Sequence, residues 1–186
     1  MSQSIENFFV LTGGPGSGKS ALLDALERAG YARSLEAGRG IIQDQHRIGG
    51  RALPWVDPNL FSEMMLNWEM RSYQVATHST GPFFFDRGVV DVVGYLRLVG
   101  LPVPKHIQKA VEIFRYNRRV FIAPPWKEIY KKDQERKQDF GEAVRTYEVM
   151  RAAYGECGYE LIELPRLPVE KRMRFILHAS GVGTKP

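Results

Sequence analysis

The sequence GGPGSGKS at residues 13–20 places the strongest constraint on how this chain can fold. It fits the pattern G-x-x-x-x-G-K-[ST], in which glycines let the backbone curl so that successive N–H groups point at phosphate oxygens. An apolar run at residues 8–13 leads into it, and leucines at helical spacing follow it. We therefore predict a strand, a phosphate-binding loop and a helix whose positive dipole end adds to the attraction of an anion.

Two side chains of this loop have specific expected tasks. Lys19 is expected to reach the β- and γ-phosphates of a nucleotide, where it would also act in catalysis, and the Ser20 hydroxyl is expected to ligate Mg²⁺. The residues predicted to bind the nucleotide are Gly13, Gly14, Pro15, Gly16, Ser17, Gly18, Lys19 and Ser20.

Strand and helix patterns alternate along the rest of the chain. Further strands are predicted at residues 31–37, 82–86, 118–123 and 159–164. Helices are predicted at residues 38–50, 57–77, 89–100, 104–116, 139–158 and 169–179. The run PFFFD lacks alternation, as expected for a strand buried on both faces of a parallel sheet. The alternation predicts an α/β fold, a three-layer sandwich around a five-stranded, mostly parallel sheet, formed as one domain over residues 1–186.

Composition limits the classes of protein to consider. No apolar run approaches the roughly 20 residues of a membrane-spanning helix, and the first residues do not resemble a secretory signal. A single cysteine, Cys157, fits a reducing compartment, so we expect a cytoplasmic protein without a membrane partner. The net charge of +5 and a basic cluster between residues 115 and 137 raise the question of nucleic acid. No nucleic-acid-reading motif accompanies this charge, so we do not expect such a partner.

Asp86 and Arg87 follow the apolar run FFF. A carboxylate at this point can reach the Mg²⁺ shell or the attacking group, so Asp86 is a candidate metal ligand and catalytic residue. Many ATPases place a glutamate directly after this aspartate to activate water, whereas an arginine cannot be that base. Hydrolysis as the sole function is therefore disfavoured. The simpler alternatives are a capping aspartate and an arginine that pairs with a nearby carboxylate.

The sequence also favours ATP over GTP, because the guanine-reading element N-K-x-D is missing. The nearest stretches, YNRRV and YKKDQ, do not fit it. ATP and Mg²⁺ are the expected cofactors.

Three stretches, GGPGSGKS, FFFDRG and KEIYKKDQERKQDF, together resemble the P-loop nucleoside and nucleotide kinases. More narrowly, the order of EAGRGIIQDQ, LPW, FFDRG, GLP, APPWKEIY and ERKQDFGEAVRTYE is similar to the AAA_28-type predicted ATPase/kinase proteins. The resemblance covers nearly the whole chain and implies a P-loop NTPase fold and ATP binding more firmly than a substrate. It implies that Asp86 serves as base or metal-shell ligand and that Arg87 clamps the acceptor or the phosphate.

The same resemblance implies a lid at residues 126–140, after the fourth strand. A lid supplies cations to the transferred phosphoryl group and excludes water once it closes. Arg136 is the first choice for that cation, ahead of Lys132 and Lys137, and a solvated helix is the alternative.

An acceptor pocket is expected between the second strand and the long helix at 57–77. Glu36, Arg39 and Trp55 are its candidate residues: a carboxylate for hydroxyls, a guanidinium for phosphate and a ring for stacking. An ion pair beside a core tryptophan is the alternative. In the loop LPRLP after the fifth strand, where such kinases pack adenine, Arg166 is a candidate for stacking on the base.

These features indicate a protein that binds Mg·ATP and transfers the γ-phosphoryl group to an unidentified small molecule of nucleoside-like type. The first alternative is an ATPase or ATP-dependent switch that acts on a protein partner. The second is a nucleic-acid-associated module that binds ATP.

Overall fold

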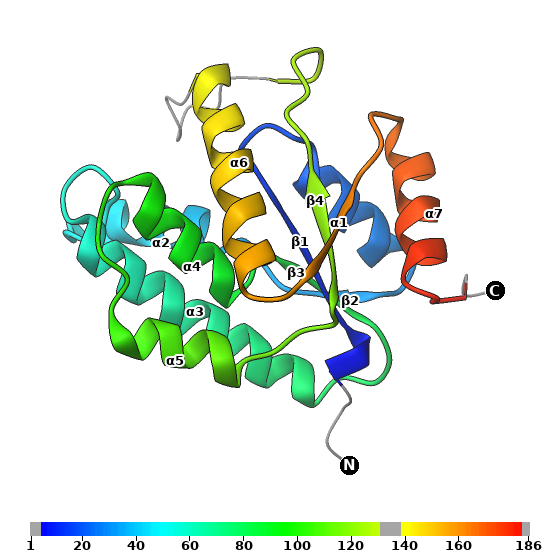
Figure 1. Ribbon diagram of the computed structural model, residues 1–186, viewed down its shortest axis with the longest axis horizontal. Coiled ribbons are helices and arrows are strands. Elements are labelled where there is room, and N and C mark those ends of the chain that lie inside the picture. The colour runs from blue at the N-terminus through cyan, green and yellow to red at the C-terminus, as the bar shows by residue number, and fades with distance from the viewer. Residues whose placement is uncertain (1–4, 131–138, 184–186) are drawn as a thin grey trace.

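The computed structural model describes residues 5–130 and 139–183 (Figure 1). Five strands form one sheet in the order β2-β3-β1-β4-β5. They are β1 (Phe8–Gly13), β2 (Ala32–Arg33), β3 (Phe83–Asp86), β4 (Arg119–Ala123) and β5 (Glu160–Glu163). Each of the four strand pairings is parallel. The predicted α/β fold with its five strands is therefore confirmed, and the sheet is parallel throughout.

Helices cover both faces of this sheet. They are α1 (Lys19–Arg28), α2 (Ala37–Ile48), α3 (Pro58–Thr77), α4 (Val89–Leu98), α5 (Lys105–Ile113), α6 (Phe140–Glu156) and α7 (Val169–Ala179), and a short 3₁₀ helix, η1 (Ile5–Asn7), precedes β1. Figure 1 shows α1 and α7 on one side of the sheet and α3, α4, α5 and α6 on the other. The arrangement is the predicted three-layer sandwich.

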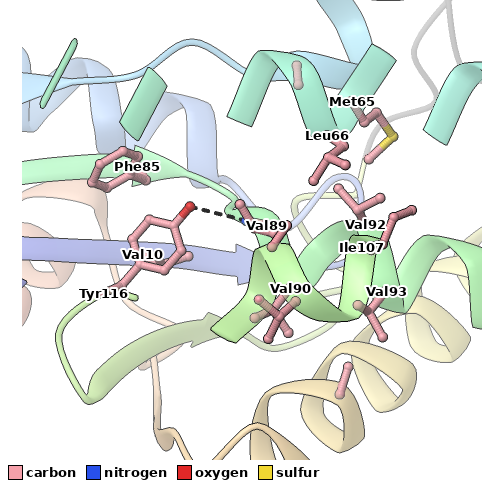
Figure 2. Close-up of a cluster of buried hydrophobic side chains, with 14 of the residues drawn as sticks. Val10, Met65, Leu66, Phe85, Val89, Val90, Val92, Val93, Ile107 and Tyr116 are labelled. Atoms are coloured by element: carbon pink, nitrogen blue, oxygen red, sulfur yellow. Dashed lines mark hydrogen bonds between the residues drawn. The ribbon is translucent and has the colours of Figure 1, made fainter. Parts of the chain in front are cut away.

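Strand β1 is buried on both faces and divides the core in two. Phe8 and Val10 pack with the helices α3 to α6, and this larger core is drawn in Figure 2. Phe9 and Leu11 point the other way and pack with α1 and α7. Because successive strand residues face opposite sides, an unbroken apolar run is what a central parallel strand requires.

The helix predicted at residues 104–116 is shorter in the structure, where α5 ends at Ile113. Phe114 leaves the helical conformation, with φ −89° and ψ 77°. The reason lies at Tyr116, which is 2% exposed and whose hydroxyl accepts a hydrogen bond from the Val89 N–H at 3.2 Å (Figure 2). Tertiary packing of one aromatic side chain against the start of α4 thus ends the helix early. The strand predicted at 31–37 is also shorter in the structure, where β2 comprises only Ala32 and Arg33.

Across the part of the chain that the structure describes, no helix combines the length and the apolar character that crossing a membrane requires.

Candidate active site

The glycine-rich loop joins β1 to α1 at the carboxyl end of the sheet. Gly13, Gly16 and Gly18 have φ values of 125°, 67° and 78°, a region that glycine enters without a steric penalty. A Cβ added at Gly13 would lie 2.5 Å from the carbonyl oxygen of Ala123 in β4. At the other end, Gly18 caps α1 without any side-chain hydrogen bond to the helix. The first N–H groups of α1 therefore have no side-chain cap, which suits them to an anion.

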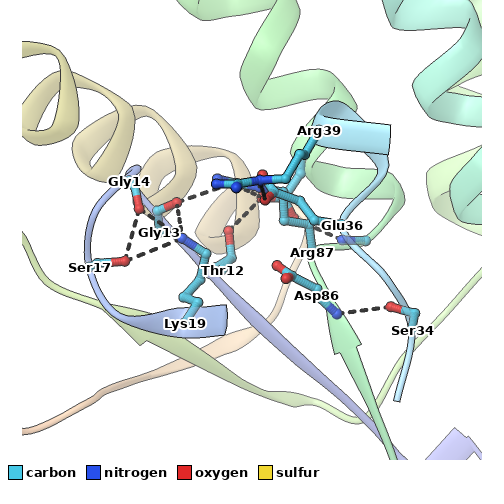
Figure 3. A network of polar contacts seen from close by, with 12 residues as sticks. Thr12, Gly13, Gly14, Ser17, Lys19, Ser34, Glu36, Arg39, Asp86 and Arg87 are labelled. Carbon is cyan, nitrogen blue, oxygen red and sulfur yellow. Dashed lines mark hydrogen bonds and ion pairs between the residues drawn. The ribbon is translucent and has the colours of Figure 1, made fainter. Parts of the chain in front are cut away.

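Lys19 turns its side chain back into this loop (Figure 3). Its ammonium group donates hydrogen bonds to the carbonyl oxygens of Gly13 at 3.2 Å and Gly14 at 2.7 Å, and to the Ser17 hydroxyl at 3.2 Å. The residue is only 6% exposed. The loop thus holds a buried positive charge on its inner side, next to the place where the sequence predicts phosphate. Ser20 lies exposed in the first turn of α1.

Asp86 ends β3, beside Leu11 of β1 in the strand register. Its N–H donates to the Ser34 hydroxyl at 2.9 Å, while its side-chain Oδ1 is buried and has no hydrogen-bond partner among the described residues (Figure 3). Burial and the neighbouring Glu36 carboxylate raise the pKa of Asp86 to about 6, although Lys19 and Arg87 act in the opposite direction. A buried carboxylate oxygen without a donor suits a cation or an acceptor hydroxyl.

Arg87 follows Asp86 and has a φ of 73°. Among the non-glycine residues that the structure describes, it alone has a positive φ. This strained turn directs the side chain toward the glycine-rich loop, where Nη1 donates to the Gly13 carbonyl at 3.0 Å. Nη1 also donates to Asp91 Oδ1 at 3.1 Å, and Nε lies 3.6 Å from Glu36 Oε1. Burial alone would lower the pKa of Arg87, but the charges of Asp91 and Glu36 raise it above its ordinary value.

Asp91, in the first turn of α4, is fully buried and was not among the residues predicted from the sequence. Besides Arg87, it accepts hydrogen bonds from the Thr12 hydroxyl at 2.6 Å, the Tyr154 hydroxyl at 2.6 Å and the Gly88 N–H at 3.0 Å. One carboxylate therefore joins β1, α4 and α6. Its four-residue spacing from Arg87 is compatible with this pair, but the spacing alone does not indicate that Asp91 is buried.

The predicted acceptor residues lie at the beginning of α2 and in the segment between α2 and α3. Glu36 is the N-cap residue of α2, and its Oε2 lies 3.8 Å from Arg39 Nε (Figure 3). Trp55 is 58% exposed and its ring lies 5.7 Å from that of His46. The ion pair of the alternative interpretation is therefore present, whereas its core tryptophan is wrong.

A cavity of about 880 Å³ lies between α2, α3, α4 and α6. Glu36, Trp55 and Arg87 line it together with Pro15 of the glycine-rich loop, whereas Arg39 is not one of its lining residues. Its apolar wall comprises Ile42, Phe61, Met65, Tyr95, Leu98, Val99 and Met150. The structure thus brings residues from distant parts of the sequence into one space that adjoins the loop.

Further charged residues near this cavity were missed by the sequence patterns, among them Arg145 and Glu69. Arg145 is exposed on α6 and lines the cavity. Glu69 of α3 is 1% exposed, and neither of its carboxylate oxygens has a hydrogen-bond partner among the described residues. Burial, with Asp91 and Asp86, raises the pKa of Glu69 well above its ordinary value. Its position four residues after Met65 and eight after Phe61 places it on the buried face of α3.

The predicted base-stacking residue, Arg166, is exposed in the loop between β5 and α7. Its Nε and Nη2 both donate to the Pro125 carbonyl, at 3.2 and 3.1 Å, so it ties this loop to the segment that follows β4. Of the predicted lid at 126–140, residues 126–130 and 139–140 are described. A Cβ added to Gly16 would lie 2.5 Å from the Tyr130 ring. Arg136, Lys132 and Lys137 lie outside the described residues.

No group of three or more metal-ligating side chains occurs within the described ranges. Mg²⁺ in phosphate-transfer sites is usually held by one or two protein oxygens together with waters and substrate phosphates. The unpartnered Asp86 Oδ1 and the exposed Ser20 hydroxyl are oxygen donors of that kind.

Comparison with known proteins places this arrangement in a family and a fold. The family model AAA_28, described as an AAA domain, matches residues 8–172. A structure of NadR in complex with NR is similar with a TM-score of 0.70 and 16% identity, over 98% of this chain and 54% of NadR, so the chain spans about half of that protein's length. Deoxyadenosine kinase from M. mycoides with dCMP and dCDP bound is similar with a TM-score of 0.60 and 12% identity, over 93% of this chain and 98% of that kinase. A search of curated protein sequences found no match.

Proposed function

The chain belongs to the AAA_28 family, and on that premise we propose that it binds Mg·ATP and transfers the γ-phosphoryl group to a small, nucleoside-like acceptor. The observation that carries the proposal is the position of Arg87. Its side chain donates to Gly13 of the glycine-rich loop and also lines the 880 Å³ cavity. The buried Arg87 guanidinium thus lies between the loop proposed to bind ATP and the cavity proposed to bind the acceptor.

Phosphoryl transfer needs positioning and charge stabilisation more than covalent help from the protein. In the proposed reaction Lys19 turns from its own loop carbonyls to the β- and γ-phosphates. Mg²⁺ held by Ser20 and Asp86 would neutralise charge on those phosphates. The acceptor hydroxyl oxygen forms the new bond to the γ-phosphorus while the bond to the β-phosphate oxygen breaks, which releases ADP. The hydroxyl proton passes to a carboxylate, and Asp86 and Glu36 are the candidates.

The electrostatics support this use of Asp86. With a pKa raised to about 6, its carboxyl group is mostly ionised at pH 7 and above, and its pKa lies close to the range in which a base works well at neutral pH. Arg87 is fixed by Asp91 and Glu36, so its charge is held in place before any ligand arrives. A site organised in advance avoids reorganisation during the reaction.

Two arginines are candidates for the cation that contacts the transferred phosphoryl group. Arg136 of the predicted lid keeps this role as an expectation from the sequence. Arg145 is a second candidate, because it is exposed on α6 and lines the cavity, as Pro15 of the glycine-rich loop does.

The cavity suits an acceptor with an apolar or aromatic body and a polar end. Its wall is mostly apolar, with Phe61 and Tyr95 in edge-to-face contact at 5.3 Å, while Glu36 and Arg87 lie where it approaches the loop. The similar structures contain NR or deoxynucleotides, which makes nucleosides a reasonable first choice of probe.

Release of ADP tests the proposal. The protein should turn over ATP slowly alone and faster with the right acceptor, in a panel of nucleosides and vitamin precursors, and Lys19→Ala and Asp86→Asn should remove the stimulation. Mass spectrometry of the acceptor should show one added phosphate. Rapid ATP hydrolysis without an acceptor, unchanged by every compound of the panel, would contradict a kinase and indicate an ATPase.

A further inference from the structure

Arg172, in the first turn of α7, is a buried cation outside the site described above. It is 2% exposed and is one of the largest fully buried side chains of the described protein. No carboxylate of the described residues lies within ion-pair distance of it, and its Nε has no hydrogen-bond partner there. Burial lowers the pKa of Arg172, without an opposing charge to raise it.

Burial of an arginine at this position lowers the stability of the folded protein. A buried charge without a counter-ion loses its hydration and gains little in return. The N-terminal end of a helix carries positive partial charge, so a cation in the first turn of α7 is disfavoured a second time. An apolar side chain of similar volume would fill the same space without either penalty. The guanidinium group therefore needs an explanation beyond packing.

Arg172 lies against the glycine-rich loop and the segment that follows β4. Its Nη1 donates to the Ser17 carbonyl at 3.2 Å and lies 2.8 Å from where a Cβ on Gly18 would be. Its guanidinium carbon lies 6.0 Å from the centre of the Trp126 ring, in the segment that follows β4. One cation thus contacts both the glycine-rich loop and the first residue of the predicted lid.

The hydrogen bond to Ser17 has a geometric consequence. A trans peptide places its C=O and the next N–H on opposite sides of the chain. Since the Ser17 carbonyl points at Arg172, the N–H of Gly18 must point away from it. That N–H is one of those that the loop pattern assigns to phosphate oxygens.

We propose that Arg172 is a positioning residue for ATP, which holds the Ser17–Gly18 peptide in its phosphate-binding orientation and couples the glycine-rich loop to Trp126. The proposal rests on the proposed function, since it needs a nucleotide in the loop. Arg172 does not touch the acceptor cavity, so its effect falls on ATP alone. Its positive charge beside the loop also becomes favourable when the negatively charged nucleotide binds.

Arg172→Met tests this role, with Arg174→Met as the matched control. Arg174 lies two residues further along the same helix and is exposed. The affinity for a non-hydrolysable ATP analogue is measured by titration calorimetry, and the KM values for ATP and for the acceptor are measured separately. We expect Arg172→Met to weaken analogue binding about 10- to 100-fold, as loss of a charged hydrogen bond does, with the acceptor KM nearly unchanged. Arg172→Lys, which keeps a charged donor, should recover part of the loss, and Arg174→Met should behave as wild type.

Fluorescence supplies a readout that a purely structural role would not affect. Analogue binding should change the Trp126 emission of the wild type, and Trp126→Phe identifies that component against Trp55 and Trp68. In Arg172→Met the change should be lost even when analogue saturates the site, because the connection from the loop to Trp126 is gone.

The outcomes separate this inference from the proposed function. A wild type that binds no analogue would overturn both. A wild type that binds, beside a folded Arg172→Met protein with the same affinity, would overturn the role of Arg172 alone. Equal losses in ATP and acceptor parameters would also overturn it, because they indicate a general loss of structure. If Arg172→Met does not fold, Arg172→Gln is held to the same criteria, since a neutral amide is less costly to bury.

Discussion

Arg87 and Asp91 form a buried ion pair across one turn at the start of α4, with Nη1 and Oδ1 3.1 Å apart. The side chains of the two residues are 9% and 1% exposed. Because Arg87 has a positive φ, the pair fixes a backbone conformation that few arginines adopt. It also fixes the Arg87 side chain, which donates to Gly13 of the glycine-rich loop and lines the cavity.

Asp91→Asn should therefore destabilise the protein and reduce activity together. Breaking a buried pair leaves Arg87 with Glu36 as its remaining carboxylate, at 3.6 Å, and we expect a loss of about 3 kcal/mol in the free energy of unfolding. Urea unfolding measures it. Glu156→Gln is the matched control, because its pair with Arg97 at 2.7 Å is exposed and such pairs contribute little. Similar effects of the two substitutions would contradict a special role for the buried pair.

Asp86→Asn should raise stability and abolish activity. The folded pKa of about 6 lies above the ordinary value of 3.8, so the stability that Asp86 contributes is fully present below pH 4 and is lost as the pH rises through 6. At pH 8 the variant should exceed the wild type by about 1–3 kcal/mol, and the difference should vanish toward pH 4.

The measurement is urea unfolding of both proteins across this range, beside the acceptor-stimulated release of ADP. Wild-type activity should fall as the pH drops below 6, because Asp86 becomes protonated. A stability difference that does not depend on pH would contradict the raised pKa, and a variant that keeps its activity would contradict the catalytic role.

Glu69→Gln provides the contrast to Asp86. Both residues are buried carboxylates with raised pKa values, so each loses stability as the pH rises through its folded pKa. Glu69 does not line the cavity. We therefore expect Glu69→Gln to be more stable than the wild type at pH 8 and to keep its KM for ATP and acceptor. A loss of activity as large as that of Asp86→Asn would show that Glu69 belongs to the reacting groups.

The sequence predicts the fold well because its signals are local. Apolar runs, helical spacing and glycine or proline at the ends locate the five strands and the helices, and the loop pattern needs only residues 13–20. Asp86 and Arg87 are found in the same way, because they follow directly on a buried strand. The wrong end of the helix at 104–116 arises from Tyr116, whose packing depends on residues far away in the sequence.

Residues that depend on several elements were not predictable from patterns. Asp91 needs Thr12 of β1 and Tyr154 of α6 to satisfy its oxygens, and a lone aspartate in a helix otherwise reads as solvated. From the sequence alone Arg172 resembles a surface residue, because its burial depends on the packing of α7 against the glycine-rich loop. The separation of Arg39 from the cavity, and the participation of Arg145 in it, likewise follow from where α2 and α6 lie in space.

Trp55 and Trp68 should respond in opposite ways to replacement by alanine. Trp55 is 58% exposed and lines the cavity, so Trp55→Ala should leave the free energy of unfolding within about 0.5 kcal/mol of the wild type but raise the acceptor KM about tenfold. Trp68 packs on the backbone at Gly40, where an added Cβ would lie 2.6 Å from its ring, and lies outside the lining of the cavity. Trp68→Ala should therefore cost about 3 kcal/mol and leave the acceptor KM unchanged. Thermal unfolding and initial rates measure both, and an unchanged acceptor KM in Trp55→Ala would remove Trp55 from the acceptor site.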